Sequence, residues 1–238
     1  MEALIKKLAR YFGIDVRRYK PQTSEDARVQ ALLSFNRIDM IFDVGANVGQ
    51  YASKIRSEGY RGKIVSFEPL SDAYSQLLKN SRNDADWIVA PRAVIGDEDS
   101  QVDINISENS LSSSILPILQ SHIDAHPSSR YLATEKVAMS RLDSIAPQYL
   151  DATTSVYIKI DTQGAESKVL DGASQTLERI KGIQIELSFV PLYEGQPLFL
   201  DIVHRLLDLG FDLHGILPVF IDQKTGRLLQ ADGIFFRS

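Results

Sequence analysis

The sequence contains no cysteine. This absence excludes disulfide bridges, thiolate metal centres, iron–sulfur clusters and a cysteine nucleophile. The sequence also lacks a long apolar run, since stretches such as 215–221 fall far short of the roughly 20 residues that cross a bilayer. Its first ten residues carry charge where a secretory signal needs an apolar core. We therefore expect an intracellular, cytoplasmic protein.

Excess positive charge is also missing. The 238 residues include 26 Lys and Arg against 31 Asp and Glu, a net charge of −5, which argues against a nucleic-acid partner. Apolar residues make up 44% of the chain and charged residues 24%, the usual balance of a globular protein. The charge is uneven, because residues 1–37 hold eight basic and four acidic side chains and so leave −9 for the remainder.

Residues 1–37 are predicted to form a helical appendage. An amphipathic helix over 3–12, ended by Gly13, is indicated by apolar side chains at helical spacing, namely Leu4, Ile5, Leu8, Tyr11 and Phe12. A second helix over 24–35 would have Ser24 as its N-cap. The first helix is expected to pack on the domain edge with a solvated basic face. The alternatives are a lid over an anionic substrate, a dimer arm and a contact with a membrane surface.

Residues 38–238 alternate between strand and helix patterns. Strands are expected at 38–44, 63–67, 87–95, 155–160 and 183–189, and helices at 50–57, 72–80, 165–180 and 198–209. This alternation predicts a doubly wound, mostly parallel sheet with helices on both faces. Two final strands, 212–221 and 228–237, flank a turn-rich hexapeptide and should close the sheet as an antiparallel hairpin. Residues 96–150 interrupt the alternation as an insertion with a Ser-rich loop, 108–115, which is either a flexible tip or a hydroxyl-rich wall of the substrate site.

The strongest local motif is Ile-Phe-Asp-Val-Gly-Ala-Asn-Val-Gly-Gln at residues 41–50. A buried strand enters a turn in which Gly45 and Gly49 let the backbone approach a ligand closely. The turn lacks the Lys-Ser/Thr pair of a phosphate-binding loop, and its glycine spacing differs from the dinucleotide fingerprint. Asp43 would suit an ammonium group. At the end of the second strand, Glu68 could accept hydrogen bonds from both hydroxyls of a ribose, and Pro69 fixes the following turn.

Acidic side chains also end the fourth and fifth expected strands. The strand at 155–160 delivers Lys159 and Asp161 towards its carboxyl end, while Gln184 and Glu186 interrupt a strand that should be apolar. If these strands are neighbours, Asp161 and Glu186 face one crevice. They could then share a proton, bind a divalent cation or accept a substrate proton. Structural pairing, with Lys159 for example, is the alternative.

The four histidines show no metal-ligand spacing; they are His122, His126, His204 and His214. His204 is expected on a helix surface. His122, in the insertion, is a candidate base, and His214 is expected near the crevice.

Taken together and in this order, the motifs resemble class I S-adenosylmethionine-dependent methyltransferases, and most closely the FkbM family. The resemblance covers roughly residues 38–237. It is carried by FDVGANVG at 42–49, FEP at 67–69, RLD at 141–143, IKIDTQGAE at 158–166, IEL at 185–187 and DGIF at 232–235. It implies a Rossmann-like, doubly wound, mostly parallel seven-stranded sheet that ends in an antiparallel β-hairpin. Some relatives have Glu where this chain has Gln163, which leaves the role of that residue open.

The resemblance also implies a cofactor site for S-adenosylmethionine, with S-adenosylhomocysteine as product. The amino-acid end of the cofactor, the ribose and the adenine would be contacted by Asp43, Gly45, Ala46, Asn47, Gly49, Glu68, Pro69 and Ala93. Asp161 is the preferred base, with Glu186 and His122 behind it and Lys159 among the catalytic candidates. A divalent metal held by Asp161 and Glu186 stays an alternative. The acceptor would be contacted by Asn109, Ser112 and Ser113.

The implied function is methyl transfer to a hydroxyl of a saccharide, glycolipid or natural product, in polysaccharide or natural-product biosynthesis. A lipid-linked or phosphorylated acceptor could face the basic N-terminal segment, which could also touch a membrane. A homo-oligomer is left open. The competing interpretations are an NAD(P)-dependent oxidoreductase of Rossmann type, which the glycine spacing disfavours, and a non-catalytic S-adenosylmethionine-binding module.

Overall fold

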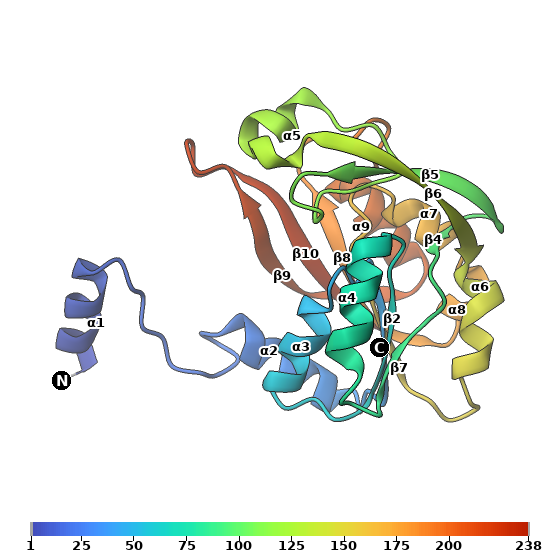
Figure 1. The fold of residues 1–238 in the computed structure, drawn as a ribbon. Helices are drawn as coiled ribbons and strands as arrows, with labels where there is room; N and C mark the ends of the chain where they lie inside the picture. Colours follow the sequence, from blue (N-terminus) through green and yellow to red (C-terminus); the bar gives the residue numbers. More distant parts are fainter. Residues whose placement is uncertain (1, 238) are drawn as a thin grey trace.

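The computed structural model describes residues 2–237 and is built around a seven-stranded sheet (Figure 1). The strand order is β3-β2-β1-β7-β8-β10-β9, and β10 runs in the direction opposite to the other six strands of this sheet. The strands are β1 (Met40–Val44), β2 (Lys63–Phe67), β3 (Trp87–Val89), β7 (Val156–Ile160), β8 (Ile180–Ser188), β9 (Phe211–Ile221) and β10 (Leu228–Arg237). The predicted doubly wound sheet with a closing antiparallel hairpin is therefore confirmed.

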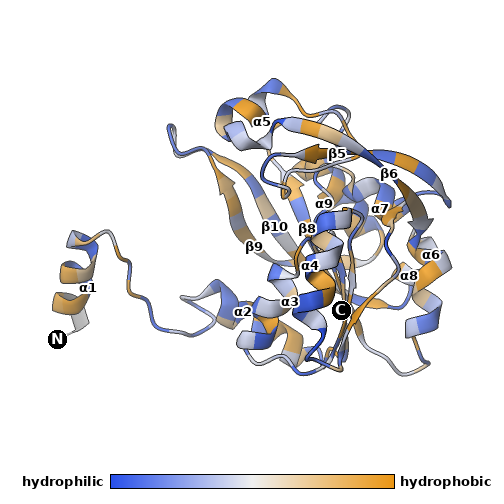
Figure 2. Ribbon diagram, viewed as in Figure 1, coloured by the Kyte–Doolittle hydropathy of each residue, from blue (hydrophilic) through white to orange (hydrophobic). Residues whose placement is uncertain are grey.

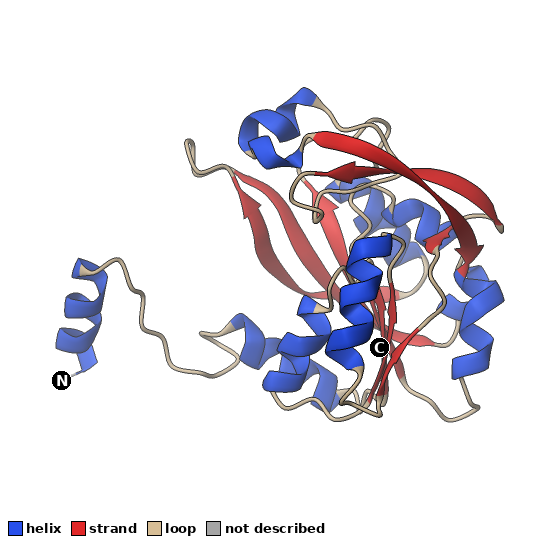
Figure 3. Ribbon diagram, in the orientation of Figure 1, coloured by secondary structure: helices blue, strands red, loops and turns tan. Residues whose placement is uncertain are grey.

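Helices cover both faces of this sheet (Figure 3). The two faces carry separate cores, and neighbouring residues of β1 point into different ones, because successive side chains of a strand alternate. Phe42 packs with residues of α7 to α9, and Ile41 with residues of α2 and α3. The helices are α1 (Glu2–Tyr11), α2 (Glu25–Phe35), α3 (Gln50–Ser57), α4 (Ser71–Ser81), α5 (Gln120–Ala125), α6 (Leu142–Ile145), α7 (Glu166–Asp171), α8 (Ser174–Leu177) and α9 (Phe199–Asp208).

The predicted insertion contributes a second sheet of three strands in the order β4-β6-β5. Its strands are β4 (Val94–Gly96), β5 (Ser100–Ser107) and β6 (Tyr131–Arg141). The prediction of one strand over 87–95 is wrong, because β3 and β4 belong to different sheets. Ala90 makes a last hydrogen bond to Ser66 of β2, and Pro91, which has no N–H to donate, follows it. The chain then turns away to begin the second sheet.

The single helix predicted over 165–180 is also wrong, because the chain breaks it into α7 and α8. A Cβ on Gly172 would lie 1.8 Å from the carbonyl oxygen of Gly96, so the end of β4 packs directly on the backbone here. Asp143 then caps α8 by accepting the N–H groups of Gln175 and Thr176, at 3.1 and 2.8 Å. The helix is therefore interrupted at the point where it packs against β4 of the second sheet.

Of the two N-terminal helices, α2 packs on the body and α1 does not. Ser24 caps α2 as predicted, because its hydroxyl accepts the N–H of Ala27 at 3.3 Å. The prediction that α1 packs on the domain edge is wrong, since α1 stands apart from the body at the end of an extended segment (Figure 1). The sheet face towards it is already covered by α2 and α3. Within residues 2–237, no helix is both long and apolar enough to span a membrane.

Replacing Gly172 by alanine should destabilise the protein, because the new methyl group would overlap the Gly96 carbonyl. We expect a loss of about 1–3 kcal/mol in the free energy of unfolding, measured by urea denaturation. Gly215→Ala is the matched control, because the nearest atom to a Cβ there is 3.8 Å away and its φ is not positive. Equal effects of the two substitutions would contradict this account of the helix break.

Candidate functional site

A cavity of about 230 Å³ lies at the carboxyl ends of the central strands. We call it the central cavity. Its wall comes from the turn after β1, the ends of β2, β7 and β8, the start of β4 and the Ser-rich loop. The strand order reverses at β1, since β2 lies on one side of it and β7 on the other. Open α/β sheets bind ligands at such a switch point.

The turn after β1 brings backbone to the floor of the central cavity. Gly45 has a φ of +81°, and a Cβ there would lie 1.9 Å from the carbonyl oxygen of Asp161. Asn47 also has a positive φ, 49°, which asparagine tolerates better than most residues. Gly45 and Asn47 both line the cavity. Only glycine lets the β1 and β7 ends approach this closely.

Glu68 lines the central cavity and is held by two backbone groups. One carboxylate oxygen accepts the N–H of Asn47 at 2.7 Å and the other accepts that of Leu70 at 2.8 Å. Burial raises the pKa of Glu68 to about 7 despite these hydrogen bonds. Pro69 and Ala93 line the same wall beside apolar side chains that include Ile95 and Ile104. An acid therefore lies next to an apolar slot.

Three of the predicted cofactor residues lie behind this wall and not among its lining residues: Asp43, Ala46 and Gly49. Asp43 is only 1% exposed; Ser66 donates to its Oδ2, and its Oδ1 has no partner among the described residues. Burial raises its pKa to about 6. Gly49 serves packing, because a Cβ there would lie 2.5 Å from the ring of Trp87.

The opposite end of the central cavity is polar. Asp161 and Glu186 both line it, as the adjacency of β7 and β8 requires. The amide of Gln163 joins them, because its Nε2 donates to Asp161 Oδ1 at 2.7 Å and lies 3.3 Å from Glu186 Oε1. This arrangement gives Gln163, whose role the sequence left open, a definite position between the two acids.

The two acids differ in protonation. Burial by itself would raise the pKa of Asp161, but the ammonium of Lys159, 2.7 Å away, holds it below its usual range. Burial also disfavours the charge on Lys159, yet the nearby acids raise its pKa above normal, Asp161 foremost. Burial raises the pKa of Glu186 well above its usual value, and the Asp161 charge adds to this. Asp161 therefore favours its ionised form, and Glu186 favours its protonated form.

Tyr193 is a member of this cluster that sequence reasoning missed. Its hydroxyl donates to Gln163 Oε1 at 2.9 Å and lies 3.1 Å from the carbonyl oxygen of Ser112. The residue is fully buried in the loop after β8. No motif surrounds it, so no local signal could have identified it; its partners come from distant parts of the chain.

Lys159 does not line the central cavity but a second cavity of about 150 Å³ on the other face of the sheet, under α2 and α3. Gln184 and Asp232 line this second cavity too, and Gln184 Nε2 donates to Asp232 Oδ2 at 2.6 Å. The hydroxyls of Tyr51 and Tyr157 donate to Oε1 of Gln184. Gln184, the polar interruption of β8, is thus fully hydrogen-bonded within the protein.

The Ser-rich loop divides into lining and supporting residues. Ser113 lines the central cavity together with Ser110 and Ser114. Asn109 and Ser112 do not; Asn109 Nδ2 donates to Ser112 Oγ at 3.0 Å, and Ser112 Oγ lies 3.0 Å from Ser129 Oγ. Of the predicted substrate residues, the structure therefore brings only Ser113 to the central cavity.

His122 is not brought to the central cavity either. Its ring is buried against Tyr193 and Phe220, with centroids 5.2 and 5.4 Å away. Burial lowers its pKa to about 4, so the ring is neutral at physiological pH. The structure does not support its predicted role as a base, because no part of it lines the cavity wall.

No group of three or more His, Asp or Glu side chains within residues 2–237 is arranged to hold a metal ion. Each oxygen of Asp161 already accepts a hydrogen bond, Oδ2 from Lys159 and Oδ1 from Gln163. A cation held by Asp161 and Glu186 would have to displace these donors.

Comparison with known proteins gives consistent results. The family model described as the methyltransferase FkbM domain matches residues 43–213. The 2-O-methyltransferase NoeI of Sinorhizobium fredii (strain NBRC 101917 / NGR234) is 27% identical over 186 residues, which cover 74% of this chain and 75% of NoeI.

Solved structures with a similar fold include the methyltransferase FkbM from Methylobacillus flagellatus KT. The TM-score is 0.51 at 14% identity, and the match covers 82% of this chain but only 43% of that one. Aeropyrum pernix fibrillarin, solved with S-adenosyl-L-methionine, matches with a TM-score of 0.46 at 11% identity, over 83% of this chain and 66% of its own.

Replacing Lys159 by methionine should destabilise the protein in a pH-dependent way. Without the cation, the pKa of Asp161 rises above that of the unfolded chain, and the pKa values of Asp43 and Asp232, already raised by burial, rise further. The folded state then binds more protons than the unfolded state, so its stability falls as the pH rises. We expect a loss of about 3–5 kcal/mol near pH 8 and a smaller one near pH 5 in urea denaturation.

Lys136→Met provides the matched control, because Lys136 is exposed on β6 in the second sheet. It should cost less than about 1 kcal/mol at either pH. A Lys159→Met effect that is the same at both pH values would contradict the charge-balancing role of Lys159.

Proposed function

Since the chain belongs to the FkbM methyltransferase family, we propose that it transfers the methyl group of S-adenosylmethionine to a hydroxyl oxygen of a saccharide, a glycolipid or another natural product. One observation carries this proposal: the central cavity has Glu68 and an apolar slot at one end and the ionised Asp161 at the other. We further propose that residues 38–238 form the catalytic domain, with 96–150 on the substrate side and 1–37 as an appendage.

The wall of the central cavity fits this cofactor. The slot beside Pro69 and Ala93 is apolar enough for adenine, and the Glu68 oxygens keep lone pairs for ribose hydroxyls. The unpartnered, buried Oδ1 of Asp43 adds a negative potential behind the Gly45 turn, which favours an ammonium group nearby. Bound S-adenosylmethionine would supply a sulfonium methyl group, which is electrophilic without further activation.

The polar end of the cavity supports activation of the acceptor. A hydroxyl is a poor nucleophile until its proton has an acceptor, and Asp161 is the ionised carboxylate lining that end. Asp161 would accept the hydroxyl proton as the acceptor oxygen takes the methyl group that bound S-adenosylmethionine would supply, with S-adenosylhomocysteine as the leaving group. Lys159 and Gln163 hold the Asp161 carboxylate, and Glu186, whose raised pKa favours its protonated form, can donate a hydrogen bond to the acceptor oxygen.

The Ser-rich loop and one relative support a hydroxyl-bearing acceptor. Ser110 and Ser113 offer hydroxyl groups along the cavity wall, and Asn109 and Ser112 hold the loop in shape. The 2-O-methyltransferase activity that NoeI is named for is an oxygen methylation. The net charge of −5 favours a small or lipid-linked acceptor over a nucleic acid.

The cofactor proposal is tested by isothermal titration with S-adenosylhomocysteine. Wild-type protein should bind it and should not bind NAD. Affinity should increase as the pH rises through about 7, where Glu68 loses its proton. Glu68→Gln should bind about 10–100-fold more weakly, because a charge-assisted hydrogen bond is worth about 1.5–3 kcal/mol, and should lose this pH dependence.

Glu178→Gln, at an exposed position, serves as the control and should leave binding unchanged. Binding of NAD in place of S-adenosylhomocysteine would overturn the proposal in favour of an oxidoreductase. Cofactor binding without methyl transfer to any hydroxyl acceptor would favour a non-catalytic binding module.

Asp161→Asn should lower kcat about 10²–10⁴-fold with any accepted hydroxyl substrate, because the proton acceptor is lost. Its affinity for S-adenosylhomocysteine should stay within a few-fold of wild type. Asp171→Asn, which alters an exposed carboxylate paired with Arg205, should keep full turnover. Near-normal turnover of Asp161→Asn would remove Asp161 from the role of base. Activity lost in excess EDTA and restored by Mg²⁺ would instead favour a metal at Asp161 and Glu186.

A further inference from the structure

Helix α1 presents an uncovered apolar face. Leu4 and Leu8 are 72% and 62% exposed, and Ile5, Tyr11 and Phe12 are exposed as well. Leu4, Leu8 and Tyr11 are spaced by four and three residues and therefore lie on one side of the helix. Figure 2 shows apolar and polar residues alternating around α1 at helical intervals. This clustering differs from single exposed leucines, which are ordinary on a protein surface.

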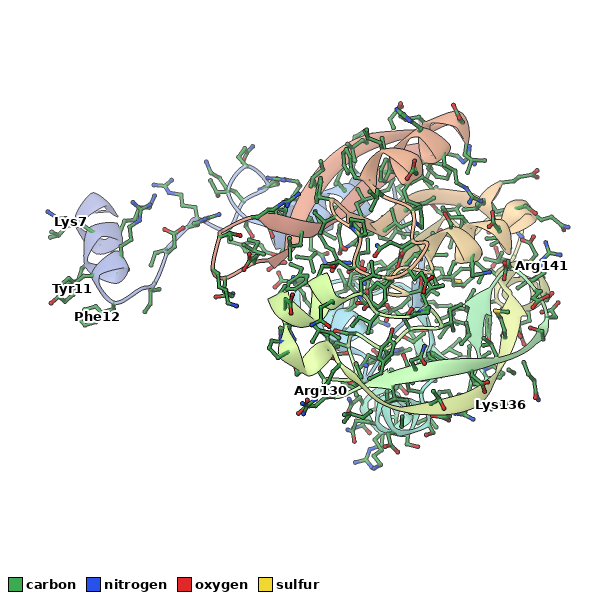
Figure 4. The ribbon with its side chains drawn as sticks, turned by 90° about the horizontal axis from the view of Figure 1, so that it is seen from above. Lys7, Tyr11, Phe12, Arg130, Lys136 and Arg141 are labelled. Carbon is green, nitrogen blue, oxygen red and sulfur yellow. The ribbon has the colours of Figure 1, made fainter. Side chains whose placement is uncertain are left out.

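The body of the protein does not cover this face. α1 projects from the rest of the molecule, and in Figure 4 the labelled side chains of Lys7, Tyr11 and Phe12 lie at α1, well away from the rest of the molecule. Residues 13–24 separate α1 from α2. Tyr19, within this segment, donates a hydrogen bond to Glu58 at the end of α3. Residues 13–18 therefore link the helix to the body, and a segment of that length can extend to about 20 Å.

The charge around the helix is positive and that of the body is negative. Residues 1–20 carry six Lys and Arg against two Asp and Glu, whereas residues 38–238 carry a net charge of −9. The basic residues lie on both sides of the turn that ends α1, at Lys6, Lys7, Arg10, Arg17, Arg18 and Lys20. An apolar face with basic flanks and aromatic side chains is typical of a helix that lies in the interface of an anionic bilayer.

We propose that α1 is a peripheral membrane anchor that inserts its apolar face into the surface of an anionic lipid bilayer. Leu4, Leu8 and Phe12 enter the acyl boundary, and the basic side chains contact lipid headgroups. The same anionic surface repels the acidic body. The segment that links α1 to the body allows the body to stay in solution while the helix is bound. This proposal does not depend on the methyltransferase reaction, although it would bring the cavity close to a lipid-linked acceptor.

The test is co-sedimentation of the full chain with vesicles. Phosphatidylcholine vesicles containing phosphatidylglycerol should bind the protein at least about tenfold better than vesicles of phosphatidylcholine alone, and raised salt should weaken binding. Leu4→Gln combined with Leu8→Gln should abolish binding to the anionic vesicles. Lys7→Gln combined with Arg10→Gln should weaken it about tenfold or more, since each basic residue near such a surface contributes about 1 kcal/mol.

The matched control is Leu132→Gln combined with Leu200→Gln. These leucines are 63% and 59% exposed on the body, close to the values for Leu8 and Leu4, so the same change in hydrophobicity is made away from α1. This variant should bind vesicles as wild type does. Binding of S-adenosylhomocysteine should be the same in all variants, which separates the anchor from the proposed reaction and shows that each variant is folded.

Two results would overturn the proposal. One is equal binding, or none, to anionic and neutral vesicles. The other is a stable dimer, seen by light scattering without lipid, that the Leu4→Gln and Leu8→Gln pair converts to a monomer; α1 would then cover a second copy of this chain and not a membrane.

Discussion

The arrangement of the candidate site depends on the buried ion pair between Lys159 and Asp161, because the lysine stabilises negative charge among several buried acids. Several acids lie close together near the carboxyl ends of β1, β7 and β8, and Asp232 of the antiparallel β10 lies beside Glu186. Burial raises the pKa of Asp43, Glu186 and Asp232. Without a cation among them, these carboxyl groups would all favour the protonated form. Lys159 lies on the α2–α3 face yet reaches Asp161 in the central cavity, and so keeps one of the acids ionised.

Close backbone packing fixes that acid in position. The approach of Gly45 to the Asp161 carbonyl joins the β1 turn to the end of β7, and any side chain at Gly45 would separate them. From the other side, Tyr193 positions the amide of Gln163, which in turn contacts Asp161 and Glu186. The result is two carboxyl groups in the same cavity with opposite pKa shifts, lowered for Asp161 and raised for Glu186. This asymmetry suits a site that accepts a proton at one group while donating a hydrogen bond from the other.

The chain also separates its surface by charge. The body is acidic, and the N-terminal appendage is basic and apolar at once. A helix of this composition gains little from packing on a body whose neighbouring sheet face is already covered by α2 and α3. Its position away from the body leaves its apolar face exposed, as the proposed membrane contact requires.

Local sequence patterns were enough to predict the sheet, its closing hairpin and the acids at the carboxyl ends of its strands. These features follow from local periodicity and chain direction, because a strand that ends at Asp43, Glu68 or Asp161 delivers that side chain to the same edge of a parallel sheet. Other features became visible only in the folded structure. They include the helix break at Gly172, the separation of β3 and β4 into different sheets, and the hydrogen bond between Tyr193 and Gln163. The folded structure also shows that His122 lies away from the cavity, that Lys159 lowers the pKa of Asp161, and that α1 stands apart from the body. Each of these depends on an atom supplied by a distant segment, and no local pattern of residues encodes which distant segment that will be.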